Sequence, residues 1–436
     1  MPASLEAEKN PDALPTLPEG WRYEELGNLV EERGICYGIV QPGVAVAEGV
    51  PIVRVNNIRN RMIDTSDMLK VEPSIESKFK RSRLRGGEVL LTLVGTLGEV
   101  AIVPERFQGW NVARAVGVIP VLKDPGSRWV AICLRSAYIQ HCIRIWATST
   151  VQATFNLRDV AKLPIPVPPK ADREAITHIL DRFDDKIELN RQMNATLEAT
   201  MRALFQSWFV DFDPVRRNAE AGESRQEDSL FPDSFEDSAL GEIPKGWRVG
   251  NFDEVATNPR RGVSVDEIES TAAYIGLEHM PRRCIALSEW GTAEKLESNK
   301  SKFRHGEILF GKLRPYFHKV GVAPVDGVCS TDILVISVSD QHWFGFVLGH
   351  ISSTELVNHT EALSTGTKMP RTKWQDIAQF EVVLPPVEIA AAFTRRMEPL
   401  VQQVITNVHQ SRTLATLRDT LLPKLLSGES SIEPIR

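Results

Sequence analysis

The sequence lacks the short motifs on which most enzymatic chemistry depends. Its 436 residues contain no Gly-x-x-x-x-Gly-Lys-Ser/Thr loop for nucleotide phosphates and no Gly-x-Gly-x-x-Gly dinucleotide turn. They contain no Gly-x-Ser-x-Gly elbow for a nucleophilic serine, and the nine histidines show no metal-ligand spacing. These absences predict a protein that binds and does not catalyse, with no cofactor or metal of its own.

Cysteine and long apolar runs are also scarce. The five cysteines are odd in number and widely spaced, so we expect reduced thiols that pack in the interior. No apolar run approaches the ~20 residues of a membrane helix, and the first twenty residues show no basic segment followed by an apolar one. We therefore expect a cytoplasmic protein with no membrane partner. The net charge of −6 neither indicates nor excludes nucleic acid, because lysines and arginines can cluster on one surface.

What the sequence does contain is two similar copies of one long segment. Trp21 of Pro-Glu-Gly-Trp-Arg returns as Trp247 of Pro-Lys-Gly-Trp-Arg, at an offset of 226 (247 − 21). Gly87 of Arg-Gly-Gly-Glu returns as Gly306 of Arg-His-Gly-Glu, at an offset of 219 (306 − 87), and a Pro-Pro pair returns at 217 (385 − 168). Solenoid repeats have periods of roughly 20–50 residues. A period above two hundred therefore indicates a tandem duplication of a whole domain.

The two copies and the composition between them divide the chain into segments. Short β-rich runs punctuated by glycine and proline, accompanied by helical patches, predict a mixed α/β domain in each copy. We call these domains repeat 1, residues 17–170, and repeat 2, residues 243–387. The other segments are expected to be a disordered tail at 1–16, long helices at 171–212 and 388–429, a loosely structured polar linker at 213–242, and a C-terminal tail at 430–436.

Both long helices show the heptad pattern of a coiled coil. In the first helix, core positions alternate in steps of four and three from Ile176 to Trp208. Adding 217 to each position gives a second series from Phe393 to Leu425, which only Arg418 interrupts. A pattern held for more than four heptads is typical of a coiled coil and not of a helix on a globular core.

The central heptad positions are polar in both helices. They are Asn190 and Asn194 in the first helix and Asn407 and Ser411 in the second. Because polar core residues cost stability and fix register and partner, we expect the two helices to pair with each other. Two unrelated surface helices are the alternative. Pro399 predicts a kink or a late start of the second helix.

Matching clusters of positive charge in the two copies favour a nucleic-acid surface. Residues 78–85 contain five cations, and residues 300–304 are similarly basic at the equivalent place in repeat 2. A single basic run is commonly a solvated loop, but a duplicated one favours shared contacts to phosphates. The candidate residues are Lys78, Lys80, Arg81, Arg83 and Lys302.

Two further segments of each copy are rich in residue types that hydrogen-bond to base edges. The segment 54–60 corresponds to 276–283, and 149–154 corresponds to 364–368. Framework residues match between the copies whereas these residues differ, as expected for two domains that recognise different sequences. The candidates are Arg54, Asn56, Asn57, Arg59, Ser149, Thr150 and Gln152 in repeat 1, and Arg260, Arg261, Glu278, His279, Lys312, Arg314, Tyr316, Ser364, Thr365, Thr367, Lys368 and Arg371 in repeat 2.

Two segments loosely match catalytic motifs. Residues 258–261, Asn-Pro-Arg-Arg, have arginine where the Asn-Pro-Pro-aromatic motif of amino-methyltransferases needs a ring to stack on the base. Glu76 and Lys78 with Asp64 or Asp67 match the carboxylate and lysine set of many Mg²⁺ nucleases, a set that recurs by chance. A self-contained nuclease or methyltransferase is therefore one alternative, and a coiled-coil adaptor that binds only protein is another.

The ordered, duplicated set of motifs resembles the specificity subunit of Type I restriction-modification systems. The motifs are the Arg-x-Gly-Glu-aliphatic-Leu strands and the segments 204–212 (LFQSWFVDF), 240–247 (LGEIPKGW) and 311–316 (GKLRPY). The likeness extends from residue 17 to residue 429 and marks Gly20, Trp21, Gly246 and Trp247 as family positions. In repeat 1, residues 94–98 replace the Lys-Leu-Arg-Pro run, so Lys312 and Arg314 are expected to contact DNA in the second half only.

The resemblance implies a division of labour among several chains. It implies two target-recognition domains, each for one half of a split double-stranded DNA sequence, with two conserved helices that pair antiparallel as a spacer. Methyltransferase subunits and motor-nuclease subunits, two of each, are expected to dock on this chain. S-adenosylmethionine, ATP and Mg²⁺ are expected on those partners and not on this chain.

Overall fold

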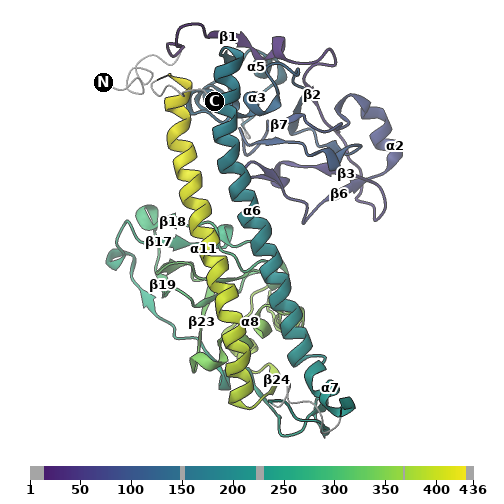
Figure 1. Ribbon diagram of the computed structural model, residues 1–436, viewed down its shortest axis with the longest axis vertical. Helices are drawn as coiled ribbons and strands as arrows, with labels where there is room; N and C mark the ends of the chain where they lie inside the picture. Colours follow the sequence, from purple (N-terminus) through teal and green to yellow (C-terminus); the bar gives the residue numbers. More distant parts are fainter. Residues whose placement is uncertain (1–13, 148–152, 222–229, 367–368, 429–436) are drawn as a thin grey trace. The chain divides into compact units, whose positions relative to one another are not determined.

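The computed structural model describes residues 14–147, 153–221, 230–366 and 369–428, and the chain divides into two compact units. Unit 1 is Met1–Asp184 with Thr416–Arg436, and unit 2 is Asp185–Ala415. Each unit holds one repeat, the beginning of the long helix that follows it and the end of the other long helix (Figure 1). Most of the two tails lies outside the described residues, as do the candidates Ser149, Thr150, Gln152, Thr367 and Lys368.

Repeat 1 contains a four-stranded antiparallel sheet of order β2-β10-β7-β8. β7 and β10 are buried at every position, which is why their Val and Leu runs are nearly continuous. A second sheet, β6-β3-β9, pairs β3 with β9 in parallel, and β1 pairs with β11. The strands are β1 Arg22–Glu25, β2 Cys36–Tyr37, β3 Val50–Val53, β4 Ile58–Arg59, β5 Met62–Ile63, β6 Leu69–Val71, β7 Val89–Thr92, β8 Val100–Ile102, β9 Asn111–Val112, β10 Val116–Ile119 and β11 Pro164–Val167.

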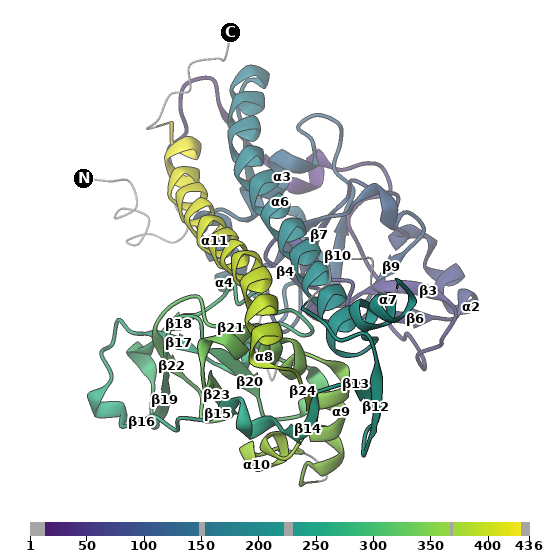
Figure 2. The ribbon, with the colours of Figure 1, turned by 60° about the horizontal axis from the view of Figure 1, so that its bottom comes forward.

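The four-stranded sheet of repeat 2 has the same strand order, with β15-β23-β20-β21 in place of β2-β10-β7-β8 (Figure 2), whereas its second sheet has five strands, β16-β19-β22-β17-β18. The parallel pair returns as β17 and β22, and β1-β11 returns as β14-β24. The duplication in the sequence is therefore a duplication of the fold. The strands are β12 Phe235–Ser238, β13 Gly241–Pro244, β14 Arg248–Asn251, β15 Ala256–Thr257, β16 Gly262–Val263, β17 Ala273–Ile275, β18 Gly291–Thr292, β19 Lys300–Phe303, β20 Ile308–Gly311, β21 Val320–Val322, β22 Gly327–Cys329, β23 Ile333–Val338 and β24 Glu381–Leu384.

Short helices also recur in matching order. In both repeats two consecutive helices follow the central strand of the sheet, and a five-residue helix precedes the closing strand. Short 3-10 turns occupy equivalent loops. The helices are α2 Pro73–Glu76, α3 Ser127–Leu134, α4 Ala137–Trp146 and α5 Leu157–Ala161 in repeat 1, and α8 Phe344–Ile351, α9 Thr354–Leu363 and α10 Trp374–Ala378 in repeat 2; the turns used below are η2 Val55–Asn57, η3 Ser77–Ser82, η7 Val265–Glu267, η8 Leu277–His279 and η9 Ala293–Lys295.

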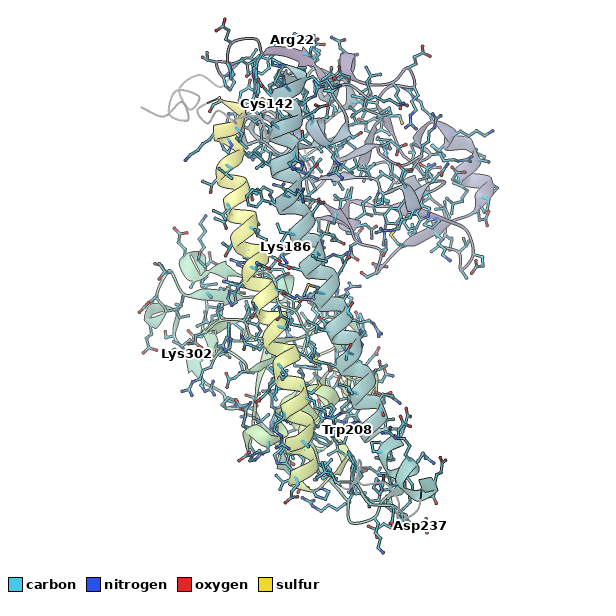
Figure 3. All side chains as sticks on the ribbon, in the orientation of Figure 1. Arg22, Cys142, Lys186, Trp208, Asp237 and Lys302 are labelled. Carbon is cyan, nitrogen blue, oxygen red and sulfur yellow. The ribbon has the colours of Figure 1, made fainter. Side chains whose placement is uncertain are left out.

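The two long helices are α6 (Lys170–Phe209) and α11 (Val387–Leu426), and they pair antiparallel. In unit 1, the first turns of α6 and the last turns of α11 share one core with repeat 1. In unit 2, the end of α6 and the beginning of α11 share another core with repeat 2. There Trp208, which lies near the end of α6 (Figure 3), packs on Phe393 with ring centroids 5.3 Å apart. The expected pairing of the two helices is confirmed.

The polar heptad residues meet inside unit 2. Asn407 Nδ2 donates to Asn194 Oδ1 at 2.8 Å, and Asn190 Nδ2 donates to Ser411 Oγ at 3.2 Å. Asn190 and Asn407 are almost fully buried. Because buried amides need partners, a shifted register would leave these groups without hydrogen bonds.

The segment 213–242 was expected to be a loose linker, but most of its described residues are ordered. α7 (Asp213–Ala221) follows α6, and β12 pairs with β13. Phe212 and Phe231 are buried in the core of unit 2, and the Phe212 ring lies edge-on to Trp247 at a centroid distance of 5.6 Å. A few aromatic anchors therefore order a segment whose polar composition predicts the opposite.

Pro399 does not mark the start of α11. The helix begins at Val387 and continues through Pro399, so the expected late start is wrong. Phe393 and Met397, which precede the proline, are buried in the core of unit 2. Their burial offsets the ~3 kcal/mol or more that an interior proline costs.

The state of the cysteines follows the expectation from the sequence. The five cysteines are free; four are buried and Cys284 is half-buried. Across the described ranges, no cluster of His, Cys, Asp and Glu is arranged to hold a metal ion. Among the same residues, no helix has the length and apolar character needed to cross a membrane.

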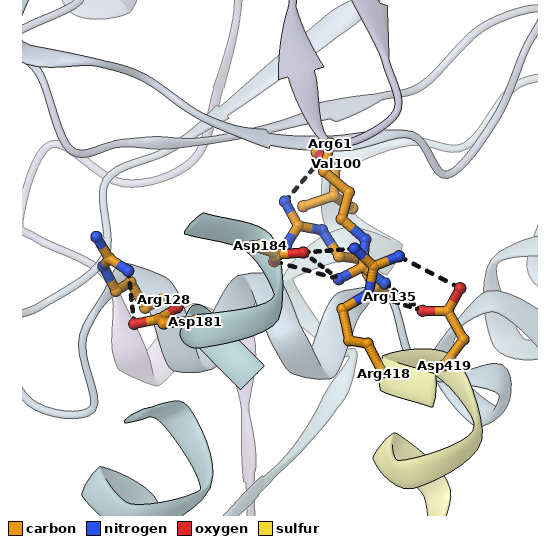
Figure 4. A network of polar contacts seen from close by, with 8 residues as sticks. All are labelled: Arg61, Val100, Arg128, Arg135, Asp181, Asp184, Arg418 and Asp419. Carbon is orange, nitrogen blue, oxygen red and sulfur yellow. Dashed lines mark hydrogen bonds and ion pairs between the residues drawn. The ribbon is translucent and has the colours of Figure 1, made fainter. Parts of the chain in front are cut away.

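A network of charges attaches repeat 1 to both long helices in unit 1 (Figure 4). Asp184 of α6 forms ion pairs with Arg418 of α11 and, at 3.4 Å, with Arg61 of the β4-β5 turn. Arg61 also contacts Asp419 of α11 at 2.7 Å, and Arg135 approaches Asp184 at 3.8 Å. Arg418, which interrupts the heptad pattern, is therefore the residue that links α11 to Asp184.

The network contains three guanidinium groups and two carboxylates. The side chains of Arg135 and Arg418 are only 12% and 10% exposed. Burial, together with the charge of Arg61, lowers the pKa of Arg135 to about 9, whereas the charge of Asp184 opposes this shift. Burial also opposes the charge of Arg418, but the bond to Asp419 and the charge of Asp184 outweigh it and raise the pKa.

A single buried carboxylate attaches repeat 2 to α6 within unit 2. Glu198 accepts hydrogen bonds from the backbone N–H groups of Ile285 and Ala286 at 3.1 and 3.3 Å, and from the Cys284 thiol at 3.1 Å. Burial raises the pKa of Glu198. Each repeat is therefore fixed to α6 by an acidic side chain of that helix.

Candidate nucleic-acid interface

The Arg-x-Gly-Glu motif forms the same supported turn in both repeats. Glu88 accepts a backbone N–H from the turn at 2.7 Å and a bond from Arg33 Nη2 at 2.7 Å. Glu307 likewise accepts a backbone N–H at 2.7 Å and two bonds from Arg261, at 2.7 and 2.8 Å. The glycine before each glutamate has φ near +82°, which disfavours other residues. Arg261, a candidate DNA contact, is thus engaged inside the protein.

The turn after β3 is built in the same way as the turn after β17. Asn57 Oδ1 accepts the N–H of Arg54 at 3.0 Å, and His279 Nδ1 accepts the N–H of Gly276 at 2.9 Å. Asn57 is buried and also donates to two backbone carbonyl groups. Arg54 contacts Asp67 at 3.4 Å. Asn57 and His279 therefore hold their turns from the inside.

Each of these turns presents one exposed polar side chain. Asn56 directly precedes Asn57, and Glu278 directly precedes His279, so the two residues are equivalent at an offset of 222 (278 − 56). Both are exposed, and the described residues provide neither with a side-chain hydrogen bond or ion pair. An amide both donates and accepts, whereas a carboxylate only accepts. The same framework thus displays different hydrogen-bonding groups.

The basic segments divide into exposed and engaged cations. Lys78 and Lys80 are exposed on η3, and Lys302 extends from β19 into solvent (Figure 3). Arg81 instead donates to a backbone carbonyl group at 2.6 Å, and Arg83 forms an ion pair with a buried glutamate. The three lysines are therefore better candidates for phosphate contacts than the two arginines.

Repeat 2 contains a polar cavity of about 360 Å³. Arg260, Lys312 and Lys373 line it together with Trp374, and Arg261 contributes to its wall. The lining residues include no Asp or Glu. The cavity therefore brings the candidates Arg260 and Lys312 to one place of positive charge.

Repeat 1 fills the equivalent place with apolar side chains. The backbone N–H of Phe155 donates to the carbonyl group of Leu93 at 2.9 Å, as that of Thr372 donates to Lys312 at 3.0 Å. Phe155 and Leu93 are fully buried in the core of unit 1. Lys312 and Thr372 thus occupy the backbone positions of Leu93 and Phe155, and both line the cavity of repeat 2.

The remaining candidates of repeat 2 lie close to Lys312 or Thr372 in the sequence. The backbone of Thr365 pairs with that of Arg371, which forms an ion pair with an aspartate at 3.4 Å. The Arg314 guanidinium lies 5.8 Å from the centroid of a phenylalanine ring, and Tyr316 is 43% exposed. Ser364 donates to a carbonyl group at the end of α9.

The last candidate of repeat 1, Arg59, is exposed on β4.

Two lining residues of the cavity, Lys373 and Trp374, were not among the sequence candidates. The offset of 217 between the copies could have indicated the cavity. It aligns Phe155 of repeat 1 with Thr372 of repeat 2, and threonine has the smaller side chain. Motif types alone did not reveal the cavity.

Comparison with known proteins relates the first part of the chain to one protein family. Residues 18–199 match the family model described as the Type I restriction modification DNA specificity domain. That model spans 182 of the 436 residues (199 − 18 + 1), and over this part the chain is similar to the Type I restriction-modification specificity subunits.

Proteins named as Type I specificity subunits match over much of the chain's length. The MjaIX specificity subunit of Methanocaldococcus jannaschii is 25% identical over 366 residues, which are 80% of this chain and 79% of the relative. The EcoBI specificity subunit of Escherichia coli is 26% identical over 272 residues, 61% of this chain and 51% of the relative. A crystal structure of the S subunit from M. genitalium aligns with 96% of this chain and 99% of its own, at 12% identity and a TM-score of 0.49.

Proposed function

We propose that each repeat recognises one half of a bipartite double-stranded DNA target. The observation that supports this proposal most directly is the pair of equivalent turns after β3 and β17. Both turns are held by the same internal hydrogen bond, and they present Asn56 in one repeat and Glu278 in the other. A constant framework with a variable exposed group is what two recognition domains of different specificity need.

The charges at these positions favour base contacts over phosphate contacts. A carboxylate such as Glu278 repels phosphates, but it accepts a hydrogen bond from the amino group of cytosine in the major groove. An asparagine such as Asn56 forms a bidentate pair with adenine. Exposed lysines on η3 and β19 would supply the phosphate contacts that position each repeat.

The proposed complex contains further chains. Two methyltransferase subunits and two motor-nuclease subunits would dock on this chain, and they would bind S-adenosylmethionine, ATP and Mg²⁺. The absence of nucleotide-binding motifs from this sequence supports that assignment. The paired helices α6 and α11 would set the number of base pairs between the two half-sites.

We expect Glu278→Asn to change base preference at one position of one half-site only. Loss of a specific base contact costs about 1–3 kcal/mol, or roughly five- to 150-fold in discrimination. The variant, co-expressed with a methyltransferase subunit, would be assayed by mapping methylated adenines and by binding to duplexes that vary at single positions. The other half-site should remain unchanged.

The matched control is Glu267→Asn, which removes an exposed glutamate of η7 in the same repeat. It should leave both half-sites unchanged. An identical motif for Glu278→Asn and the parent would remove Glu278 from the recognition surface. Failure of the parent complex to bind DNA, despite stable assembly with its partner, would instead favour a protein-only adaptor.

A further inference from the structure

We infer that the cavity of repeat 2 binds a single nucleotide unit, with its phosphate held by Arg260, Lys312 and Lys373. The inference rests on the proposed function only for the source of that nucleotide, which is either the target DNA or a free nucleotide. The two sources share the chemistry of the site.

The charges that line the cavity favour an anionic ligand. Three cationic side chains line the cavity, and no Asp or Glu is among the lining residues. Arg261 is already neutralised by its two bonds to Glu307, so the unbalanced charge comes from the other three. Lys373 has only a long 4.0 Å contact with a carboxylate, Asp376. A confined surface of one sign attracts an anion.

The volume of the cavity favours a ligand larger than a phosphate ion. The cavity volume of about 360 Å³ far exceeds the ~10–15 Å³ that a cavity needs to hold one water molecule. It therefore exceeds the space needed for one small oxyanion, and it lies within the roughly 300–1,000 Å³ of small-molecule sites. The ligand must bring a further group besides the phosphate.

The aromatic and polar side chains of the cavity wall indicate the nature of this further group. Trp374 forms part of the wall, and Asn258 and Thr331 add polar groups. An aromatic face beside hydrogen-bonding side chains suits a nucleobase, because every base has a π-face and polar edges. Phosphate and base together make a nucleotide the ligand class that fits.

The comparison with repeat 1 shows that the cavity is a property of repeat 2. At the equivalent backbone positions repeat 1 has Leu93 and Phe155, both fully buried. The shared framework therefore accepts either a filled core or an open, cationic cavity. Lys312 and Thr372 give repeat 2 the second arrangement.

The test transfers the residues of repeat 1 into repeat 2. The double variant Lys312→Leu with Thr372→Phe should fill the cavity, and Lys312→Gln should keep its shape while it removes one charge. Lys295→Leu, at an exposed lysine of η9 outside the cavity, controls for the loss of one positive charge. Thermal unfolding of each complex would establish that the variants fold.

Two binding measurements on the complete complex with its methyltransferase subunits separate the sources. The first uses deoxynucleoside monophosphates in equilibrium dialysis, and the second uses duplex DNA that contains the mapped target. Filling the cavity should weaken one of these by about tenfold or more, with a smaller loss for Lys312→Gln and none for Lys295→Leu. Loss of DNA affinity alone assigns the nucleotide to the target, and loss of monophosphate binding assigns it to a free nucleotide.

The inference is overturned if folded Lys312→Leu/Thr372→Phe complex retains parental affinity in both measurements. That result would leave the proposed function intact, because the parent would still methylate a bipartite motif. Conversely, a parent complex without a bipartite motif would refute the proposed function whatever the cavity binds.

Discussion

Inserting one heptad into each of α6 and α11 lengthens the unread spacer of the DNA target by roughly two to three base pairs and leaves both half-sites unchanged. Seven helical residues add about 10 Å, and successive base pairs lie about 3.4 Å apart. A seven-residue insertion also keeps the heptad positions in phase, so the paired helices retain their core. Adenine methylation mapped across host DNA would report both spacer and half-sites.

The insertion points follow from the division of the chain. The boundary between the two units falls after Asp184 in α6 and after Ala415 in α11. Insertions there leave the polar contacts of Asn190 with Ser411 and of Asn194 with Asn407 intact. An insertion in α6 alone is the matched control, and it should abolish methylation because the helices lose their register. An unaltered spacer in the double insertion would refute the role given to the helix pair.

Replacing Asp184 by alanine destabilises unit 1 by about 3 kcal/mol, because it removes the carboxylate shared by three arginines. Arg135 and Arg418 are largely buried and would lose their nearest compensation. For a unit of this size the loss corresponds to a decrease in the melting temperature of roughly 6–12 °C. Calorimetry of the chain in complex with its partner would measure it.

Asp185→Ala is the matched control for this prediction. Asp185 is the next residue of α6 and is exposed, so its removal should change the melting temperature little. The pair Asp184→Ala and Arg418→Ala should be less damaging together than the sum of the single changes, because both act on one network. Equal effects of Asp184→Ala and Asp185→Ala would show that the network contributes nothing to stability.

The sequence predicts the duplicated framework well because its signals are periodic or repeated. Heptads identify α6 and α11, and the polar heptad residues indicate that they pair. The linker was the clear error, since Val215 and Phe231 are too few to outweigh the polar composition of this segment, although their burial orders it. The composition of a segment does not predict whether one of its few apolar residues packs into a core formed by distant parts of the chain.

The candidate site was harder to predict, because residue type does not reveal where a side chain is engaged. Arg81 and Arg261 are as basic as Lys78, yet internal hydrogen bonds occupy them. Asn57 and its counterpart His279 differ in type but hold equivalent turns. Only three-dimensional contacts separate such residues from their exposed neighbours.

The central claim is that this chain recognises a bipartite DNA target through its two repeats. Its most direct test is to co-express the chain with a methyltransferase subunit and to map methylated adenines across host DNA. The account predicts one motif with two specified half-sites and a spacer of fixed length. A single continuous motif, or methylation that does not depend on this chain, would contradict it.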